Sequence, residues 1–323
     1  MKQTVSTILA ISIIVIATGS LLSQKKKSRF FSEEETTINT ENGNIYGTLL
    51  IPKKVKTKIP VALIIAGSGP TDRDGNNPVM KNNSLKMMAE GLGKNKIASL
   101  RYDKRGIAKS KEAAINEKDI RFDDFVTDAA KWIEKLKQDN RFSSVIVIGH
   151  SEGSLIGMIA GEKSNADKYI SLAGVGNNIS VVLKEQLKDQ PKKIKEESYI
   201  IIDSLAQGDT VVNINQNMKS LFRKSVQAYL ISWLKYEPQI EIKKLNIPIL
   251  LIQGTTDMQV SVDEANLLKK AYPKAELEII ENMNHVLKES TDDYVENMKT
   301  YYTPDIPLKE ELIEIITKFI LDE

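Results

Sequence analysis

The chain has 323 residues, enough for one large hydrophobic core or two smaller ones. Its 45 basic and 43 acidic side chains nearly balance, so no excess of positive charge indicates a nucleic-acid partner. The absence of cysteine excludes disulfides, thiolate zinc sites and cysteine nucleophiles. Only His150 and His285 are present, which argues against a histidine-rich metal site. We therefore expect neither a metal nor an organic cofactor.

Residues 1–24 carry a short basic start and then no charged side chain before Lys25. This pattern is typical of a secretory signal peptide, and its length also suits an uncleaved membrane anchor. We expect an exported protein that is periplasmic, extracellular or associated with a membrane through this segment. The charges that follow, including Lys25 to Lys27, favour a cytoplasmic face instead, so that alternative stays open.

Strand and helix patterns alternate along the rest of the chain. Alternating residues on both sides of Glu41-Asn42-Gly43 predict a β-hairpin. The continuous apolar run at 61–67 predicts a strand buried on both faces of a parallel sheet. Further strands are predicted at 97–103, 144–149, 169–174, 247–254 and 275–280. Apolar spacing predicts helices at 84–95, at 122–139, after Ser151 and at 307–323. The order predicts an α/β domain with a doubly wound, mostly parallel sheet.

One segment interrupts this order. Residues 177–244 contain helical patterns with aromatic residues and no strand-like run. We expect them to form a helical cap inserted into a core made of residues 30–176 and 245–323. The alternative is that these helices simply extend the core.

The motif Gly149-His150-Ser151-Glu152-Gly153 lies between a buried strand and a helix. Glycine-x-serine-x-glycine in that context indicates a nucleophile elbow, a strained turn that exposes the serine hydroxyl. The first helical turn would also direct free N–H groups at the reacting oxygen. The alternative is a glycine-rich turn without chemistry.

A serine hydroxyl needs a neighbouring base, and His285 is the only histidine after Ser151. Asp257 follows a buried strand and would hold the His285 imidazole in the required tautomer. Asp263 and Glu264 are weaker candidates, because they stand at the expected start of a helix, where acidic residues are common. His150 is expected to pack or hydrogen-bond beneath Ser151.

An oxyanion hole needs two N–H donors. The backbone N–H of Glu152 is one candidate, and that of Ser68, in the Gly67-Ser68-Gly69 loop after an early strand, is the other. The alternative for the Ser68 segment is an ordinary loop. We expect Asp72 to Asp74 to form a solvated turn rather than to line the pocket mouth. The Glu152 carboxylate is expected to be held by an arginine or by backbone donors.

The motifs "AGSGPTDRDGNN", "LRYDKRGIAKS", "GHSEGS" and "GTTDMQVS" resemble those of the α/β-hydrolase superfamily, in particular bacterial carboxylesterases and S33-type serine aminopeptidase-like hydrolases. The resemblance covers nearly all of the chain after residue 24 and implies an α/β-hydrolase fold. It implies Ser151, Asp257 and His285 as a catalytic triad, with Ser68 and Glu152 as backbone donors. Ala108 stands where this family usually has glycine, in a segment that we expect to be structural.

These residues predict hydrolysis of a small-molecule carboxylic ester through an acyl-enzyme on Ser151. Cap aromatics and methionines favour an apolar pocket for short to medium acyl chains. Aminopeptidase activity is the close alternative, and it needs an anion such as Glu185 or Glu196 to bind the substrate amine. A non-catalytic binding protein of the same fold is a third possibility. No feature of the sequence sets an oligomeric state.

Overall fold

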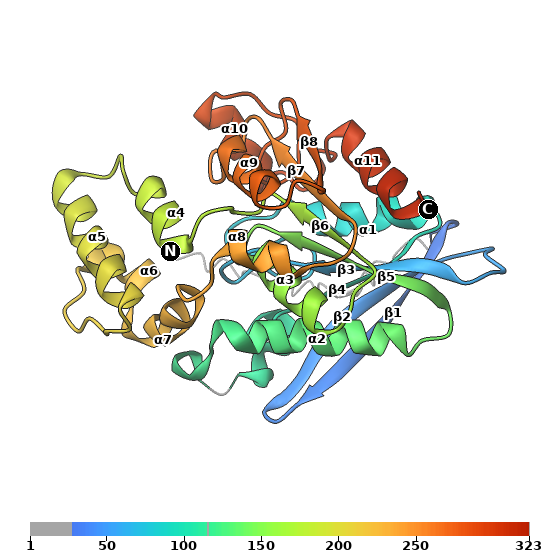
Figure 1. The fold of residues 1–323 in the computed structure, drawn as a ribbon, viewed down its shortest axis with the longest axis horizontal. Coiled ribbons are helices and arrows are strands. Elements are labelled where there is room, and N and C mark those ends of the chain that lie inside the picture. Colours follow the sequence, from blue (N-terminus) through green and yellow to red (C-terminus); the bar gives the residue numbers. More distant parts are fainter. Residues whose placement is uncertain (1–27, 115, 323) are drawn as a thin grey trace, which may run out of the picture.

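The computed structural model describes residues 28–114 and 116–322, so the leader predicted over 1–24 lies outside the described residues. Their central feature is an eight-stranded sheet with the order β1-β2-β4-β3-β5-β6-β7-β8 (Figure 1). The strands are β1 Phe31–Thr40, β2 Gly43–Pro52, β3 Ile59–Ile65, β4 Ala98–Tyr102, β5 Phe142–His150, β6 Lys168–Leu172, β7 Ile249–Gly254 and β8 Glu276–Ile280.

Strand pairing confirms the predicted sheet. β1 and β2 form an antiparallel hairpin, β2 pairs antiparallel with β4, and each later neighbouring pair is parallel. The apolar run of β3 is continuous because its alternate residues belong to two different cores: Val61, Leu63 and Ile65 to one, Ala62 and Ile64 to the other. The central strand β3 is therefore buried on both faces of the sheet.

Helices cover those two faces, as a doubly wound fold requires. Side chains of α2 and α3 share the core of Val61, while those of α1 and α11 share the core of Ile64. The helices are α1 Ser84–Lys94, α2 Phe122–Lys137, α3 Glu152–Lys163, α4 Ile179–Gln186, α5 Lys192–Ala206, α6 Lys219–Phe222, α7 Lys224–Trp233, α8 Pro238–Glu241, α9 Val262–Ala271, α10 Tyr294–Tyr302 and α11 Glu310–Leu321. Short 3₁₀ turns are η1 Ala108–Ala113, η2 Glu117–Asp119, η3 Gln216–Met218 and η4 Ile242–Lys244.

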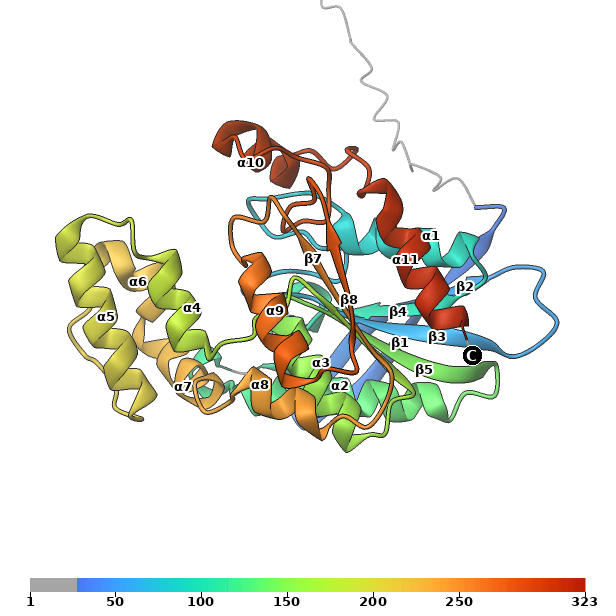
Figure 2. The same cartoon turned by 45° about the horizontal axis from the view of Figure 1, so that its top comes forward.

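Between β6 and β7 the chain forms α4 to α8 and no strand among the described residues. Figure 2 and Figure 1 agree that α4 to α7 gather at one end of the sheet, away from its layered centre. Apolar residues of these helices join the core on the α2 side of the sheet, where Trp233 stacks on Phe122 with ring centroids 5.8 Å apart. This group of helices lies over one end of the sheet, and the division into core and cap stays our interpretation of it.

No helix in the described part of the chain combines the length and apolar character that a membrane crossing needs.

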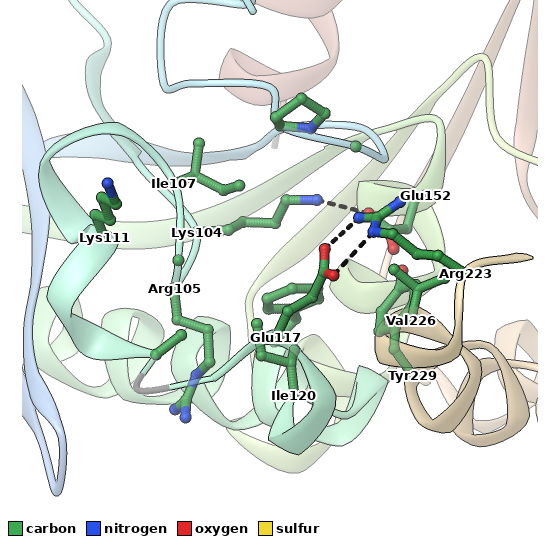
Figure 3. Close-up of a pocket in the computed structure, with 15 residues that line it drawn as sticks. Lys104, Arg105, Ile107, Lys111, Glu117, Ile120, Glu152, Arg223, Val226 and Tyr229 are labelled. Carbon is green, nitrogen blue, oxygen red and sulfur yellow. Dashed lines mark hydrogen bonds and ion pairs between the residues drawn. The ribbon is translucent and has the colours of Figure 1, made fainter. Parts of the chain in front are cut away.

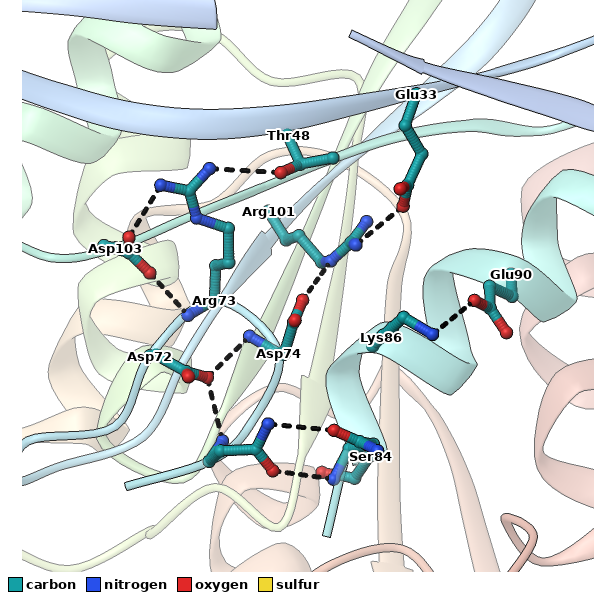
Figure 4. Close-up of polar contacts among 12 residues, drawn as sticks. Glu33, Thr48, Asp72, Arg73, Asp74, Ser84, Lys86, Glu90, Arg101 and Asp103 are labelled. Carbon is teal, nitrogen blue, oxygen red and sulfur yellow. Dashed lines mark hydrogen bonds and ion pairs between the residues drawn. The ribbon is translucent and has the colours of Figure 1, made fainter. Parts of the chain in front are cut away.

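The loop after β3 is tied to the sheet by buried charges, so the expectation of a solvated turn is wrong for Arg73. Its side chain is 9% exposed, and its guanidinium lies 2.6 Å from a carboxylate oxygen of Asp103 at the end of β4 (Figure 4). The backbone N–H of Arg73 also donates to Asp103, and Asp74 pairs with Arg101 at 2.8 Å. Two consecutive loop residues thus hold this loop against β4.

Ala108 adopts a positive φ of 43° at the start of η1. A residue with a Cβ is strained in that region, whereas glycine is not. This explains in physical terms why glycine is usual here. The segment that contains Ala108 is attached to β2, because the Ser110 hydroxyl accepts a hydrogen bond from the backbone N–H of Tyr46.

The Arg73–Asp103 pair gives a stability prediction. Arg73→Leu should lower the free energy of unfolding by about 3 kcal/mol, because removing one partner of a buried pair leaves the other charge uncompensated. Lys86→Leu is the control, since Lys86 forms a pair with Glu90 that is one-third exposed and contributes about 0.5 kcal/mol or less. Urea denaturation of both variants measures the difference, and equal losses would contradict the importance of the buried pair.

Candidate active site

Ser151 occupies a tight turn between β5 and α3. Its backbone has φ 55° and ψ −121°, a conformation that residues with a Cβ rarely adopt. A Cβ placed on Gly149 would lie 2.2 Å from the carbonyl oxygen of Gly153, and one placed on Gly153 would lie 2.4 Å from that of Ile65. Both glycines are therefore required for the helix to approach the sheet this closely.

Asp257 and His285 come together although 28 residues separate them. Asp257 follows β7 and His285 follows β8, and parallel neighbouring strands bring these two loops to the same edge of the sheet. The Nδ1 atom of His285 lies 2.8 Å from Oδ2 of Asp257. Because the carboxylate can only accept, Nδ1 carries the proton and Nε2 is left as the basic nitrogen.

The Asp257 side chain is 1% exposed, and burial alone would disfavour its charge. The charge and hydrogen bond of His285, together with the backbone N–H groups of Val260 and Gln259, outweigh burial and hold the pKa of Asp257 below its ordinary value. The Gln253 amide donates to Asp257 from 3.1 Å. The carboxylate is thus kept ionised and fixed in place.

His150 lies beneath the elbow and contacts the loop that carries His285. Its Nε2 atom donates to the backbone carbonyl oxygen of His285 over 2.8 Å, and the two rings are 4.8 Å apart. Burial, with a smaller effect of neighbouring His285, lowers the pKa of His150 to about 3, so the ring is neutral. This hydrogen bond joins the nucleophile turn to the loop of His285.

Ser68 lies in the loop after β3, and that loop packs directly against the elbow. A Cβ placed on Gly67 would lie only 3.1 Å from the Cβ of Ser151. Among the described residues, no backbone carbonyl accepts the N–H of Ser68, and the N–H of Glu152 belongs to the unpaired first turn of α3. Both N–H groups are free to bind an oxyanion, and their role in one stays a prediction.

Two cavities meet at Ser151. One, of about 260 Å³, is lined by Ser68, Ser151 and His285. The other, of about 330 Å³, is lined by Ser68, Ser151 and a set of mainly apolar residues from the helices between β6 and β7. These apolar residues include Ile179, Val182, Leu183, Leu221, Val226, Leu230 and Trp233.

Within the described residues, the Ser151 side chain takes part in no hydrogen bond, including one to His285. Hydrogen bonds between nucleophile and base are often long in enzymes without substrate and shorten when substrate binds. The structure therefore brings Ser151, Asp257 and His285 around shared cavities, and their catalytic roles stay a prediction.

The Glu152 carboxylate is held by Lys104, so the expectation of an arginine or backbone partner is wrong. The Nζ atom of Lys104 lies 2.6 Å from Oε2 of Glu152, and both side chains are at most 2% exposed (Figure 3). Lys104 belongs to the Asp-Lys-Arg-Gly run that we expected to be structural. Lys104 closely follows a buried strand, but nothing near it in the chain indicates Glu152, 48 residues away, as its partner.

The two acids considered for binding a substrate amine lie on the outer surface. The Glu185 side chain is 66% exposed beside Lys188, and that of Glu196 is 59% exposed near Lys192. Neither lines the two cavities at Ser151. In the described part of the chain, no three His, Asp or Glu side chains are grouped as a metal ion would require.

Comparisons with known proteins identify similar hydrolases. The model of a family described as serine aminopeptidase, S33, matches residues 82–230. The esterase EstD of Thermotoga maritima is 27% identical over 272 residues, which are 80% of this chain. The chain spans 60% of the length of that relative.

Solved structures of esterases share the fold. Est1E from Butyrivibrio proteoclasticus, solved with ferulic acid bound, has a TM-score of 0.62 at 18% identity, over 89% of this chain and 100% of that one. The esterase Pf2001 of Pyrococcus furiosus has a TM-score of 0.53 at 15% identity, over 90% of this chain and 92% of that one.

The buried neutral His150 gives a prediction about acid stability. Between pH 6.5 and about 3 the unfolded chain protonates this imidazole and the folded protein does not, so the free energy of unfolding falls as the pH falls through that window. His150→Gln keeps a hydrogen-bond donor but cannot be protonated, so its unfolding free energy should depend less steeply on pH. Urea denaturation from about pH 7 to about pH 4 measures both slopes, and parallel slopes would contradict the prediction.

Proposed function

We propose that this chain is a serine hydrolase of the α/β-hydrolase superfamily, which hydrolyses carboxylic esters of small molecules through an acyl-enzyme on Ser151. One observation carries the proposal. The 2.8 Å Asp257–His285 hydrogen bond lies beside a serine whose backbone is held in a strained turn between two obligatory glycines. The similarity to esterases supports ester substrates.

The proposed reaction uses the groups of the site that have no hydrogen-bond partner among the described residues. His285 Nε2 takes the proton of the Ser151 hydroxyl as the oxygen attacks the ester carbonyl, and Asp257 stabilises the imidazolium that forms. The N–H groups of Ser68 and Glu152 bind the resulting oxyanion. His285 then protonates the departing alcohol, and a water molecule that it deprotonates releases the acid from Ser151.

The cavities support a substrate that is apolar on one side of the scissile bond. The cavity beneath the cap places Ile179, Val182 and Trp233 near Ser151, which suits a short to medium acyl chain. The smaller cavity, which His285 also lines, remains for the alcohol. This division puts the departing oxygen next to the group that protonates it.

Aminopeptidase activity is the second candidate, because the matching family is described by that activity. The acids that the sequence offered for the substrate amine, Glu185 and Glu196, are exposed on the outer surface and paired with lysines. Ester hydrolysis needs no such anion and is therefore favoured.

Substitution of the nucleophile tests the proposal. Ser151→Ala should lose at least about 10⁴-fold in kcat on p-nitrophenyl esters from acetate to palmitate, because the acyl-enzyme cannot form. Ser164→Ala, at the other end of α3, is the matched control and should retain wild-type turnover. Turnover of aminoacyl-p-nitroanilides without ester turnover would favour the aminopeptidase. No turnover and no labelling of Ser151 by a fluorophosphonate would favour a binding protein.

The choice of acid is tested separately. Asp257→Asn should lower kcat by about 10³- to 10⁴-fold near neutral pH, because an amide favours the wrong tautomer of His285. Asp263→Asn is the control, since Asp263 is exposed in the first turn of α9 while Asp257 is the hydrogen-bond partner of His285, so Asp263 should contribute nothing to turnover. An equal loss in both variants, or a loss only in the Asp263 variant, would contradict the assignment of Asp257.

A further inference from the structure

Lys104 is a buried lysine beside the nucleophile turn that the proposed reaction leaves without a role. It follows β4, its side chain is 2% exposed, and its Nζ atom has two acceptors. One is Oε2 of Glu152 at 2.6 Å, and the other is the carbonyl oxygen of Gly67 at 2.7 Å. Nζ also lies 5.0 Å from the centre of the Phe125 ring, a favourable cation–π position.

Each acceptor of Lys104 is connected to one of the two proposed oxyanion donors, because one is in the Gly67–Ser68 peptide and the other is the side chain of Glu152. The Gly67 carbonyl and the Ser68 N–H are the two ends of one peptide group. A trans peptide is planar, so its C=O and N–H point in opposite directions, and no peptide bond among the described residues is cis. A hydrogen bond that fixes the Gly67 oxygen toward Lys104 therefore fixes the Ser68 N–H away from Lys104.

The cavities place Lys104 and Ser151 on different sides of the Gly67–Ser68 peptide. Ser68 and Ser151 line the same two cavities, and Lys104 lines neither of them. Lys104 lines instead a third cavity of about 360 Å³, which Glu152 shares (Figure 3). Lys104 thus stands behind the donors, out of reach of the reacting atoms, so any effect on the reaction passes through the peptide and the carboxylate that it holds.

We infer that Lys104 is a positioning residue of the oxyanion hole, which it orients by holding the Gly67–Ser68 peptide on one side and the Glu152 side chain on the other. This inference rests on the proposed function, in which the Ser68 and Glu152 N–H groups bind the oxyanion. Catalysis by such donors depends on their being oriented before charge develops.

The effect is mainly geometric. The positive charge of Lys104 and the negative charge of Glu152 lie 2.6 Å apart and largely cancel at the distance of the oxyanion. A hydrogen bond to the Gly67 oxygen additionally polarises that peptide and strengthens its N–H as a donor. Lys104 should therefore act on the transition state, where the oxyanion exists, and much less on the bound ester.

The test separates the effect of the Lys104 hydrogen bond to Gly67 from the effect of losing the Lys104–Glu152 ion pair. Glu152→Gln removes the carboxylate but leaves Lys104 able to donate to the Gly67 carbonyl, so its measured kcat is the reference for the comparison. Adding Lys104→Met to that variant removes the donor without leaving a buried unpaired charge. The double variant should lose about 10- to 100-fold in kcat relative to Glu152→Gln, with KM within about twofold. Its affinity for a trifluoromethyl ketone, which forms the oxyanion adduct on Ser151, should fall by the same factor.

Lys168→Met is the matched control. Lys168 also donates to backbone carbonyls and lies over an aromatic ring, that of Phe319, but it is at the beginning of β6. Its loss should leave kcat unchanged. If the double variant with Lys104→Met melts before assay, Lys104→Gln in the Glu152→Gln background replaces it, because glutamine is too short to bridge both acceptors, and the same loss is expected.

The outcomes distinguish this inference from the proposed function. Equal kcat in Glu152→Gln and the double variant, or a change confined to KM, would overturn the role of Lys104 while leaving the esterase intact. A parallel fall in kcat and in ketone affinity supports it. A wild-type protein with neither ester turnover nor fluorophosphonate labelling of Ser151 would overturn both proposals together.

Discussion

The site depends on how closely three backbone segments approach one another at Ser151. Gly149 and Gly153 leave no room for a Cβ at the start of α3, and Gly67 lies against Ser151 itself. Because these segments are in direct contact, the elbow and the loop after β3 bring Ser68, Ser151 and Glu152 to the lining of one cavity. A side chain at Gly149 or Gly153 would collide with backbone oxygens and push α3 away from the sheet, whereas one at Gly67 would meet the Ser151 side chain at 3.1 Å and need a smaller shift.

Buried charges then fix what the backbone brings together. Arg73 pairs with Asp103 and so attaches the loop after β3 to the end of β4. Lys104, which follows Asp103 in the chain, donates to the Gly67 carbonyl and to Glu152. Each of these ions is nearly removed from water, so each needs its partner in order to remain buried. Adjacent residues at the end of β4 therefore hold the same loop at two points, and this double attachment limits how far the Ser68 peptide can rotate.

The sequence predicts those parts of the site whose signal is local. Apolar runs locate the strands, and glycine spacing locates the turn at Ser151, because both reflect the geometry of neighbouring residues. Contacts between distant residues carry no such signal: Lys104 and Glu152 are 48 residues apart, and His150 and the His285 carbonyl are 135 apart. Arg73 was expected in a solvated turn for this reason, since nothing beside it in the chain indicates that Asp103 covers it.

The polar and the apolar residues around Ser151 come from different parts of the fold. Ser68, Lys104, Ser151, Asp257 and His285 all follow strands of the sheet, at the edge where the ends of parallel strands meet. The helices between β6 and β7 add mainly apolar wall to the cavity at Ser151. In the proposed reaction, substitutions in that wall would alter the shape that a substrate meets without changing the groups assigned to proton transfer and oxyanion binding. Under this proposal, substrate preference would change through the helices between β6 and β7 while the chemistry stays with residues that follow the strands.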